Sequence, residues 1–250
     1  MNQTITVITG ATRGLGLALT EALLQAGSHV IAMGRASNVE LERLAAEHGE
    51  RLLLIQGDLA DAESTQRAAA EMTKALEGRR ATCCRLIQNA GIVAPILPAD
   101  ELTNLQDIRR AFDVNIAAPI FITACFLKAT ASVSDRRIML ISSGAGRNPT
   151  GSWGVYCATK AAMDHYASVL AAESHPNLLI SSVAPGVIDT GMQVEIRSTP
   201  VEKFPSVGRF ENMHQDGVLA HAQTTAARLL KLLDGDAFAQ KTIDDIRNHV

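Results

Sequence analysis

Short apolar runs alternate with longer amphipathic segments along most of the chain. The runs are rich in β-branched residues and predict seven strands: Ile5–Thr9, His29–Met33, Arg51–Gln56, Cys84–Gln88, Arg137–Ser142, Leu178–Val183 and a short last one near Thr242. The segments between them have helical periodicity: Gly14–Ala26, Asn38–Glu47, Asp61–Glu77, Leu105–Thr130, Trp153–Ser174 and Gly217–Leu233. Strands that alternate with helices form a parallel sheet with helices on both faces. The pattern therefore predicts an α/β fold, a doubly wound parallel sheet of about seven strands.

The chain offers no obvious point of division. It has 250 residues, and no tract rich in Gly, Ser or Pro interrupts it. A single domain over residues 1–250 is therefore expected. Residues 190–216 lack a clean periodicity and follow the sixth strand, so they are expected to form a substrate loop over the carboxyl edge of the sheet, where ligands bind in such folds.

Composition excludes several classes of function. The formal net charge of −3 argues against nucleic-acid binding, which needs a basic face. No apolar run is expected to reach the ~20 residues of a membrane span, and the N-terminus does not resemble a secretory signal. The four cysteines lack CxxC spacing and the seven histidines lack ligand spacing, so no metal site is expected. Reduced thiols in a cytoplasmic protein fit these observations.

The segment "TGATRGLG" follows the first predicted strand and opens the first predicted helix. Gly10 permits a tight turn, and Gly14 and Gly16 allow the backbone to approach a diphosphate closely. The free N–H groups at the start of the helix then face the anion. The turn predicts a dinucleotide site on a Rossmann-like sheet.

The end of the second strand bears on which dinucleotide binds. Proteins specific for NAD usually carry Asp or Glu there, which binds the ribose 2′-hydroxyl. Here the position holds Gly34, Arg35 follows it, and Arg13 lies in the glycine turn. Two arginines without an acid suit a 2′-phosphate, because guanidinium groups pair with phosphate oxygens. The cofactor is therefore predicted to be NADPH/NADP.

A second group of polar residues follows the fifth strand. Ser143 stands at its carboxyl end, and Tyr156 and Lys160 are spaced i, i+4, which places them on one face of the next helix. A hydroxyl, a phenol and an ammonium group beside a dinucleotide suit the reduction of a carbonyl group, whose oxygen must gain a proton.

These features together resemble the short-chain dehydrogenase/reductase family over nearly the whole chain. The matching pieces are TGxxxGxG at Thr9–Gly16, "GDL" at Gly57–Leu59, "QNAG" at Gln88–Gly91, Asn115 in "DVNIAAP", the Ser143–Tyr156–Lys160 set and "PGVIDT" at Pro185–Thr190. Gln88 departs from the Asn that the family more often has, and little functional loss is expected from it.

Within the family, "NPTGSWGVYCATKAAMD" and "APGVIDTGMQVEIR" resemble sepiapterin reductases and bacterial benzil (1,2-diketone) reductases, including Cys157 and the Met192–Gln193 pair. The resemblance implies a pterin-anchoring aspartate near the C-terminus. Here that stretch reads "TIDDIRNHV": Asp244 and Asp245 lie close by, but the anchoring position falls on Arg247. An aromatic or aliphatic diketone is therefore favoured over a pterin.

The resemblance also implies a role for each residue. Tyr156 donates the proton, Ser143 hydrogen-bonds the same oxygen, Lys160 favours the phenolate and binds the nicotinamide ribose, and Asn115 orders a water that connects Lys160 to solvent. Contacts to the cofactor are expected from Gly10, Thr12, Arg13, Gly14, Leu15, Gly16, Arg35, Asp58, Leu59, Asn89, Ala90, Gly91, Tyr156, Lys160, Pro185, Gly186, Val187 and Thr190. Contacts to the substrate are expected from Val93, Ser143, Gly144, Trp153, Tyr156 and Met192.

Other functions remain open at this point. A 3-oxoacyl-carrier-protein reductase or another alcohol dehydrogenase of the family is the nearest alternative, although residues 190–216 show no excess of basic residues for an acidic carrier. A dinucleotide sensor without turnover tends to lose the tyrosine or the lysine, and both are present here. By resemblance, the expected partners are a small-molecule carbonyl substrate and further copies of the chain, as a homodimer or homotetramer paired through the long helices after the fourth and fifth strands.

Overall fold

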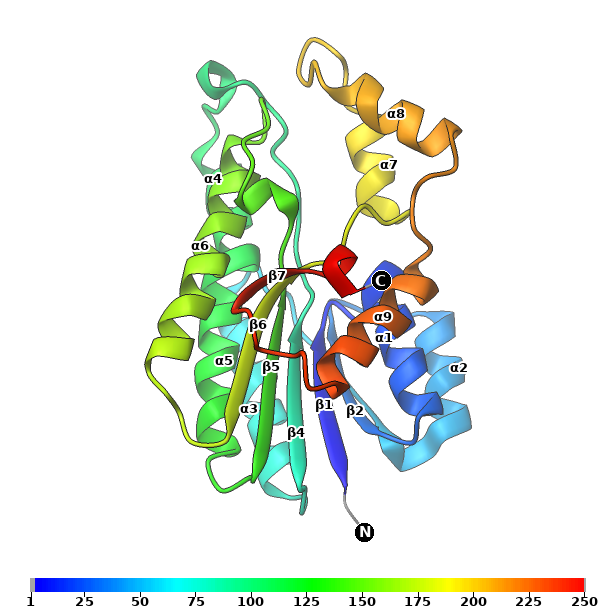
Figure 1. The fold of residues 1–250 in the computed structure, drawn as a ribbon, viewed down its shortest axis with the longest axis vertical. Helices are drawn as coiled ribbons and strands as arrows, with labels where there is room; N and C mark the ends of the chain where they lie inside the picture. The colour runs from blue at the N-terminus through cyan, green and yellow to red at the C-terminus, as the bar shows by residue number, and fades with distance from the viewer. Residues whose placement is uncertain (1–2, 250) are drawn as a thin grey trace.

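A seven-stranded parallel sheet forms the centre of the molecule, with the strand order β3-β2-β1-β4-β5-β6-β7 (Figure 1). The structure is a computed structural model, and it describes residues 3–249. The strands are β1 Thr4–Thr9, β2 His29–Gly34, β3 Leu52–Gln56, β4 Cys83–Gln88, β5 Asp135–Ile141, β6 Leu178–Ala184 and β7 Ile243–Asp245. The predicted doubly wound sheet is confirmed, and each strand lies within about two residues of its predicted bounds.

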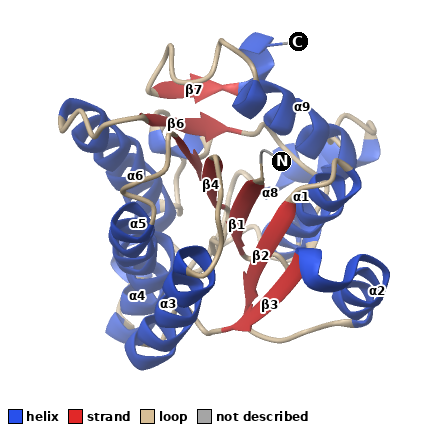
Figure 2. Cartoon of the chain, turned by 90° about the horizontal axis from the view of Figure 1, so that it is seen from below, coloured by secondary structure: helices blue, strands red, loops and turns tan. Residues whose placement is uncertain are grey.

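Helices cover both faces of this sheet (Figure 2). They are α1 Gly14–Gln25, α2 Val39–His48, α3 Ala62–Glu77, α4 Leu105–Phe112, α5 Ala118–Ala129, α6 Gly154–Ala172, α7 Gly191–Arg197, α8 Val207–Gln215 and α9 Ala222–Asp234. In both views α3, α4, α5 and α6 lie on one side of the sheet and α1, α2 and α9 on the other, whereas α7 and α8 stand above the carboxyl ends of the strands (Figure 1).

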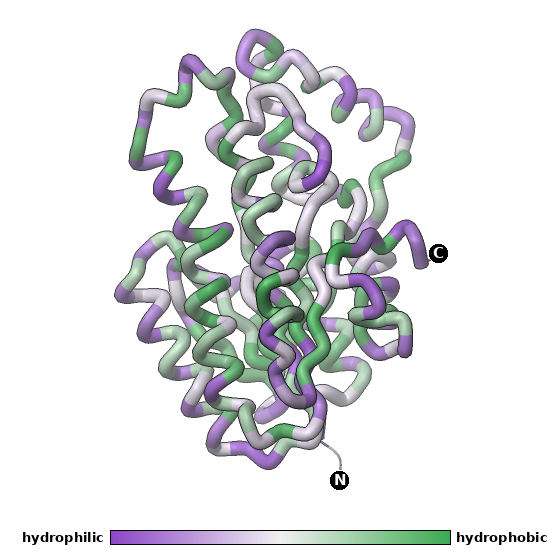
Figure 3. Tube along the Cα trace, turned by 60° about the vertical axis from the view of Figure 1, so that its left-hand side comes forward, coloured by the Kyte–Doolittle hydropathy of each residue, from purple (hydrophilic) through white to green (hydrophobic). Residues whose placement is uncertain are grey.

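Each face of the sheet has its own hydrophobic core. Leu19 of α1 and Leu229 of α9 are fully buried on one face, and Met72 of α3 and Phe126 of α5 are fully buried on the other. The hydropathy colouring shows apolar strands inside and helices that are mixed in character (Figure 3). Burial on both faces explains why the strands read as continuous apolar runs rather than as alternating ones.

Local capping explains where two of the helices begin. The Asn38 side chain accepts a hydrogen bond from Leu41 N at 2.8 Å, and the Asp61 side chain accepts one from Ser64 N at 2.7 Å. A side chain that accepts a hydrogen bond from the backbone N–H three residues later satisfies one of the free N–H groups of the first helical turn. The helices α2 and α3 therefore start one residue after these caps, close to their predicted starts.

Three predicted elements differ from the structure. The helix expected over Leu105–Thr130 contains a π-helical turn at Asp113–Ala117, which separates α4 from α5. The helix expected to begin at Gly217 begins at Ala222 instead, because Gly217 has φ +65° and ends the turn after α8. Residues 190–216 are not an irregular loop: they form α7 and α8, which are too short for their periodicity to stand out in the sequence.

The apolar stretch Leu105–Ala129 also corrects an expectation. It has 25 residues and a mean hydropathy of 1.5 over its most apolar window, which by length and composition is enough to cross a membrane. In the structure Ile122 and Phe126 of this stretch are fully buried in the core beside α3. Core helices of α/β proteins have the same apolar composition, so the hydropathy of this stretch is explained by packing.

The chain order places a crevice at one end of the sheet. From β1 the chain winds outward through β2 and β3, then returns to the other side of β1 with β4. The connections that leave β1 and β4 therefore lead to helices on opposite faces of the sheet, and ligands of open parallel sheets bind at such a switch point (Figure 2).

Candidate active site

A cavity of about 570 Å³ lies at the carboxyl ends of the strands. It extends from the glycine turn after β1, past the loops after β2, β4, β5 and β6, to the inner faces of α7 and α8. The loop after β3 lines it as well, so residues from six loops face it, including Gly10, Asp58, Asn89, Ser143 and Thr190. The cavity brings together residues of every motif that the sequence analysis singled out, although Asn115 itself does not line it.

The glycine turn packs closely against the loop after β4. Gly10 has φ +68°, and a Cβ atom on it would lie 2.9 Å from Ala90 Cα, so only glycine fits there. The Asn89 side chain donates to the carbonyl oxygens of Thr9 at 3.0 Å and Gly10 at 3.2 Å. These contacts hold the glycine turn against the loop after β4, and Gly14 and Leu15 at the N-terminus of α1 line the cavity.

The second strand ends in a position that no acid can occupy without rearrangement. A Cβ atom on Gly34 would collide with the Thr12 side chain. Beside it, Arg13 and Arg35 are exposed and line the cavity. Among residues 3–249 neither guanidinium takes part in an ion pair. This end of the cavity therefore presents two free positive charges in reach of an anionic ligand.

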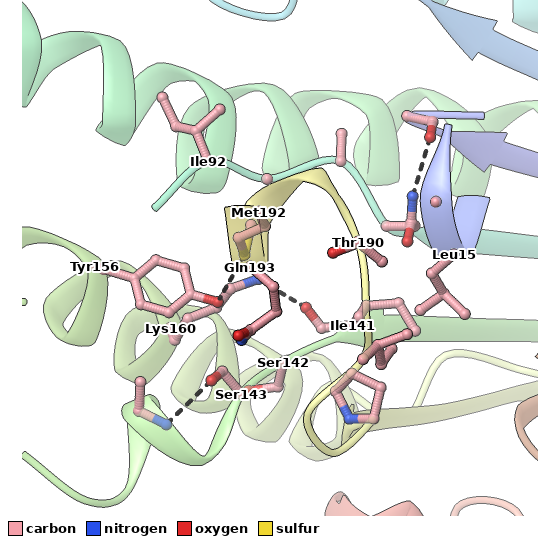
Figure 4. Close-up of a pocket in the computed structure, with 18 of the residues that line it drawn as sticks. Leu15, Ile92, Ile141, Ser142, Ser143, Tyr156, Lys160, Thr190, Met192 and Gln193 are labelled. Atoms are coloured by element: carbon pink, nitrogen blue, oxygen red, sulfur yellow. Dashed lines mark hydrogen bonds between the residues drawn. The ribbon is translucent and has the colours of Figure 1, made fainter. Parts of the chain in front are cut away.

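The tyrosine, the lysine and the serine meet at the centre of the cavity (Figure 4). Tyr156 and Lys160 lie one turn apart on α6, and Ser143 follows the end of β5. The Lys160 ammonium donates to the carbonyl oxygen of Ile141 at 2.8 Å and lies 5.8 Å from the centre of the Tyr156 ring. The Tyr156 hydroxyl lies 4.0 Å from Met192 Sδ. The phenol and the ammonium therefore share one side of the cavity, as the i, i+4 spacing predicts.

Burial perturbs both titratable groups of this set. It raises the pKa of Tyr156 to about 12, and the nearby Ser143 hydroxyl offsets only part of this effect. It also lowers the pKa of Lys160 to about 8, with the Asp164 carboxylate acting in the opposite direction. Both groups thus favour their neutral forms more than they do in water. A lysine with this pKa is still mostly cationic at neutral pH, and its charge favours the phenolate.

Asn115 lies behind the cavity wall rather than in it. Its side chain donates to the Ile92 carbonyl at 2.9 Å, accepts from Ile92 N at 2.9 Å, and donates to Thr159 Oγ1 at 3.1 Å. A Cβ atom on Gly91 would lie 3.4 Å from Asn115 Oδ1 and 3.6 Å from Lys160 Nζ. Asn115 Oδ1 and Lys160 Nζ therefore lie on the same side of Gly91, and Asn115 reaches this loop from the π-helical turn Asp113–Ala117.

Aromatic rings form the far end of the cavity. The Trp153 ring stacks on Phe204 with centroids 5.3 Å apart, and it meets the Tyr156 ring edge to face at 5.5 Å. Phe210 of α8 completes this cluster and lines the cavity. Val93, expected in the cavity wall, is instead fully buried in the cluster, and its neighbour Ile92 lines the cavity. A flat apolar ligand fits such a surface.

Most of the other expected site residues also line the cavity. They are Gly10, Thr12, Arg13, Gly14, Leu15, Arg35, Asp58, Leu59, Asn89, Ala90, Gly91, Gly144, Pro185, Gly186, Val187, Thr190 and Met192. Gly16 does not, because it is buried against the Gly10 carbonyl oxygen. The site thus contains the expected set except for Gly16, Asn115 and Val93, which support it from behind.

A buried carboxylate that the sequence analysis did not identify lies beneath the site. Asp164 Oδ1 accepts hydrogen bonds from the Ser142 and Ser182 hydroxyls at 2.6 Å each, and its Oδ2 accepts one from Arg147 Nε at 3.0 Å. Arg147 Nη1 in turn donates to the Asp244 carbonyl at 2.8 Å. This network ties the strand end that carries Ser143 to α6 and to the C-terminal strand. Its only sequence signal is an acid one turn after Lys160.

The C-terminal stretch reaches the cavity as well. Asp245 and Arg247 both line it and form a two-pronged ion pair, with distances of 2.8 Å and 2.6 Å. Asp244 is turned away and buried, and its carboxylate accepts from His249 Nε2 at 2.7 Å. Arg247, expected at the pterin-anchoring position, therefore already has a carboxylate partner.

Gln193 is a second residue that the sequence analysis did not place in the site. It lines the cavity from α7 and is 6% exposed. The available signal was the Met192–Gln193 pair, which carries part of the family resemblance. Only Met192 was expected to face the substrate, because residues 190–216 showed no periodicity that would orient their side chains.

Comparisons with known proteins give a family and several relatives. A family model described as short chain dehydrogenase matches residues 4–201. Benzil reductase ((S)-benzoin forming) of Bacillus cereus is 34% identical over 239 residues, which cover 94% of this chain and 95% of that protein. Sepiapterin reductase of Rattus norvegicus is 29% identical over 245 residues, 94% of this chain and 92% of that protein.

Solved structures agree with this result. The crystal structure of the KRED1-Pglu enzyme superimposes with a TM-score of 0.83 at 29% identity, and the match covers 95% of this chain and 98% of that one. A serine dehydrogenase complexed with NADP+ has a TM-score of 0.76 at 23% identity and covers 96% of this chain and 93% of that one, a likeness of fold alone.

Proposed function

This chain belongs to the short chain dehydrogenase family, oxidoreductases that bind nicotinamide dinucleotides, and from that premise we propose that it is an NADPH-dependent carbonyl reductase for vicinal dicarbonyl compounds. One observation carries the proposal. Tyr156, Lys160 and Ser143 meet halfway along a cavity that has free guanidinium groups at one end and aromatic rings at the other.

The residues present fit a dinucleotide phosphate. The glycine turn allows a diphosphate to approach the N-terminus of α1, where free N–H groups and the helix dipole favour an anion. Arg13 and Arg35 are the residues that would hold the 2′-phosphate, and Gly34 leaves no carboxylate to repel it. When bound, the cofactor supplies hydride to the carbonyl carbon of the substrate.

The chain's own residues supply the proton and hold the substrate oxygen. The Tyr156 hydroxyl donates its proton to that oxygen, while the Ser143 hydroxyl donates a hydrogen bond to it. The Lys160 ammonium, 5.8 Å from the phenol ring, stabilises the phenolate that remains. Asn115 positions the Ile92 backbone beside this pair and is the residue proposed to order a water next to Lys160.

The substrate class follows from the aromatic end of the cavity and from the named relatives. Trp153, Phe210 and Met192 form an apolar wall next to the Tyr156 hydroxyl, which suits an aryl group on the reacting carbonyl. A vicinal dicarbonyl has an electron-poor target carbon, so hydride addition is easier than to an isolated ketone. Because Arg247 is paired with Asp245, a small aryl diketone is proposed to react better than sepiapterin.

The proposal is tested by following NADPH oxidation with benzil, 1-phenyl-1,2-propanedione, diacetyl, sepiapterin and an acetoacetyl thioester. The expected order places the two aryl diketones first in kcat/KM. A thioester reduced ten times faster than every dicarbonyl would favour the 3-oxoacyl-carrier-protein reductase instead. Binding of NADPH without turnover of any of them would favour a dinucleotide sensor.

The same proposal includes a homo-oligomer in the cytosol. Phe112, Ile120, Phe121 and Val169 are apolar but exposed, and they lie on α4, α5 and α6, which share one side of the sheet (Figure 1). Exposed apolar side chains gathered on neighbouring helices suit an interface with another copy. All four cysteines are free thiols, as in proteins of a reducing compartment. Size-exclusion chromatography with light scattering tests the oligomer.

A further inference from the structure

Residues 142–147, the serine turn, carry Ser143 and are held to α6 at both ends by one carboxylate. That carboxylate belongs to Asp164, which is 4% exposed. Its Oδ1 accepts a hydrogen bond from the hydroxyl of Ser142, the residue before Ser143, at 2.6 Å. Its Oδ2 accepts one from Nε of Arg147, at the other end of the turn, at 3.0 Å. A single buried group therefore fixes the chain on both sides of Ser143.

The serine turn also packs directly on the backbone of α6. A Cβ atom on Gly146 would lie 2.9 Å from the carbonyl carbon of Lys160, so only glycine lets the turn approach the helix this closely. The turn thus lies against the residue that carries the ammonium group. Any shift of the turn changes where Ser143 stands relative to Lys160 and to Tyr156, one helical turn earlier.

The orientation of the Ser143 hydroxyl depends on the same turn. Its oxygen accepts a hydrogen bond from Ala145 N at 3.2 Å (Figure 4), which leaves its own proton for the substrate oxygen. A hydrogen bond weakens steeply when its geometry is poor, and misplacing a catalytic contact by about 1 Å can cost about 100-fold in rate. The contribution of Ser143 to the reaction is therefore sensitive to whatever fixes the serine turn.

We propose that Asp164 is a positioning residue for the reaction, which holds the serine turn so that the Ser143 hydroxyl stands at the substrate oxygen. The inference rests on the proposed function and adds a residue that touches neither substrate nor cofactor, since Asp164 itself does not line the cavity.

A buried network can also serve stability alone, and two serines of this network separate the two roles. The Ser182 hydroxyl donates to the same Oδ1 atom of Asp164 at the same distance as the Ser142 hydroxyl, 2.6 Å. Both serines are buried, at 0% and 3% exposure, but Ser182 lies within β6 and not in the serine turn. Both are uncharged, whereas the Asp164 carboxylate also opposes the lowering of the pKa of Lys160 by burial.

The test compares Ser142→Ala with Ser182→Ala. The assay follows NADPH oxidation with the carbonyl compound that the wild-type protein reduces fastest, and urea unfolding is measured beside it. We expect Ser142→Ala to lower kcat about 5-fold and Ser182→Ala to lower it less than about 2-fold, with similar losses of stability in the two variants. For Ser142→Ala, kcat and kcat/KM should fall together, because the weakened contact is made mainly in the transition state. The dissociation constant for NADPH, measured by fluorescence titration, should stay unchanged in both variants.

Two further variants test the same inference. In a Ser143→Ala background, Ser142→Ala should lower kcat by less than about 2-fold more, because the hydroxyl that it positions is already gone. Asp164→Asn, which releases the Arg147 end of the turn, should lower kcat about 10-fold.

The outcomes separate the inference from the proposed function. A wild-type protein that oxidises NADPH with none of the carbonyl compounds would overturn both. Equal kcat values for Ser142→Ala and Ser182→Ala in an active protein would show that the network serves stability alone and would overturn the inference, as would a full 5-fold loss from Ser142→Ala in the Ser143→Ala background.

Discussion

Replacing Asp164 by alanine should destabilise the protein strongly. The substitution leaves the Ser142 and Ser182 hydroxyls and the Arg147 guanidinium without their common acceptor. Removing one partner of a buried ion pair costs about 3–5 kcal/mol, and a buried hydroxyl without a partner costs about 1–3 kcal/mol. The hydroxyls can rotate and the Arg147 side chain is 28% exposed, so the losses do not add fully. We expect the free energy of unfolding to fall by about 3–5 kcal/mol.

One further variant separates the contribution of the Arg147 ion pair from that of the two serine hydrogen bonds, and a second one serves as a control at an exposed ion pair. Asp164→Asn keeps an oxygen where Oδ1 accepts from both serines but places an NH₂ group against Arg147 Nε, so it should cost about 2–3 kcal/mol. Glu63→Ala removes an exposed i, i+4 pair in which Arg67 lies 3.7 Å away, and it should cost less than about 0.5 kcal/mol.

Equilibrium unfolding in urea at a fixed protein concentration measures all three changes. The reasoning is refuted if Asp164→Ala costs less than about 1 kcal/mol with an unchanged m-value, since the three donors would then have found other partners. It is also refuted if Asp164→Asn is as damaging as Asp164→Ala, because the serine contacts would then contribute nothing.

Other predictions concern the chemistry and the cofactor. Tyr156→Phe should lower kcat at least ~100-fold with NADPH affinity nearly intact, as expected for a lost general acid; a variant that keeps a tenth of the activity would place the proton donor elsewhere. Lys160→Ala should weaken both turnover and NADPH binding measured by fluorescence titration. NADPH should exceed NADH in kcat/KM by at least ~100-fold, and Arg35→Ala should remove much of that difference without affecting NADH; equal use of both cofactors by the native protein would contradict the assignment. Burial lowers the pKa of Lys160 from 10.5 to about 8, so the protein takes up a proton when it unfolds between these two pH values. The free energy of unfolding of the cofactor-free protein should therefore increase with pH in this range. The increase should reach up to about 3 kcal/mol relative to the Lys160→Met variant, which lacks the titrating group. Above about pH 10 the raised pKa of Tyr156, about 12, acts in the opposite direction, because the unfolded chain then loses the phenol proton first; urea unfolding at a series of pH values checks both signs.

Local sequence patterns determined most of the fold. Each of the strands β1 to β6 is long enough and apolar enough to be recognised by itself, whereas β7 has only three residues, two of them aspartates. Asn38 and Asp61 mark helix starts because a cap is a contact between residues close in the chain. The i, i+4 spacing of Tyr156 and Lys160 likewise needs no tertiary information. Patterns failed where an element is short or ends on backbone geometry, as in α7 and at Gly217.

Tertiary structure decided which side chains meet. Asp164 reaches two strands and the C-terminal segment only after the sheet has formed, so no spacing in the sequence marks it as the centre of a network. Val93 and Ile92 are neighbours in a loop, and only the folded structure shows that Val93 is buried in the aromatic cluster whereas Ile92 lines the cavity. The sequence itself shows that position 34 is a glycine and not an acid. Only the structure shows that the Thr12 side chain, from another loop, occupies the space that a side chain at this position would need. Contacts between residues distant in the chain depend on the assembled sheet, and a linear pattern records only the residues that are near each other along it.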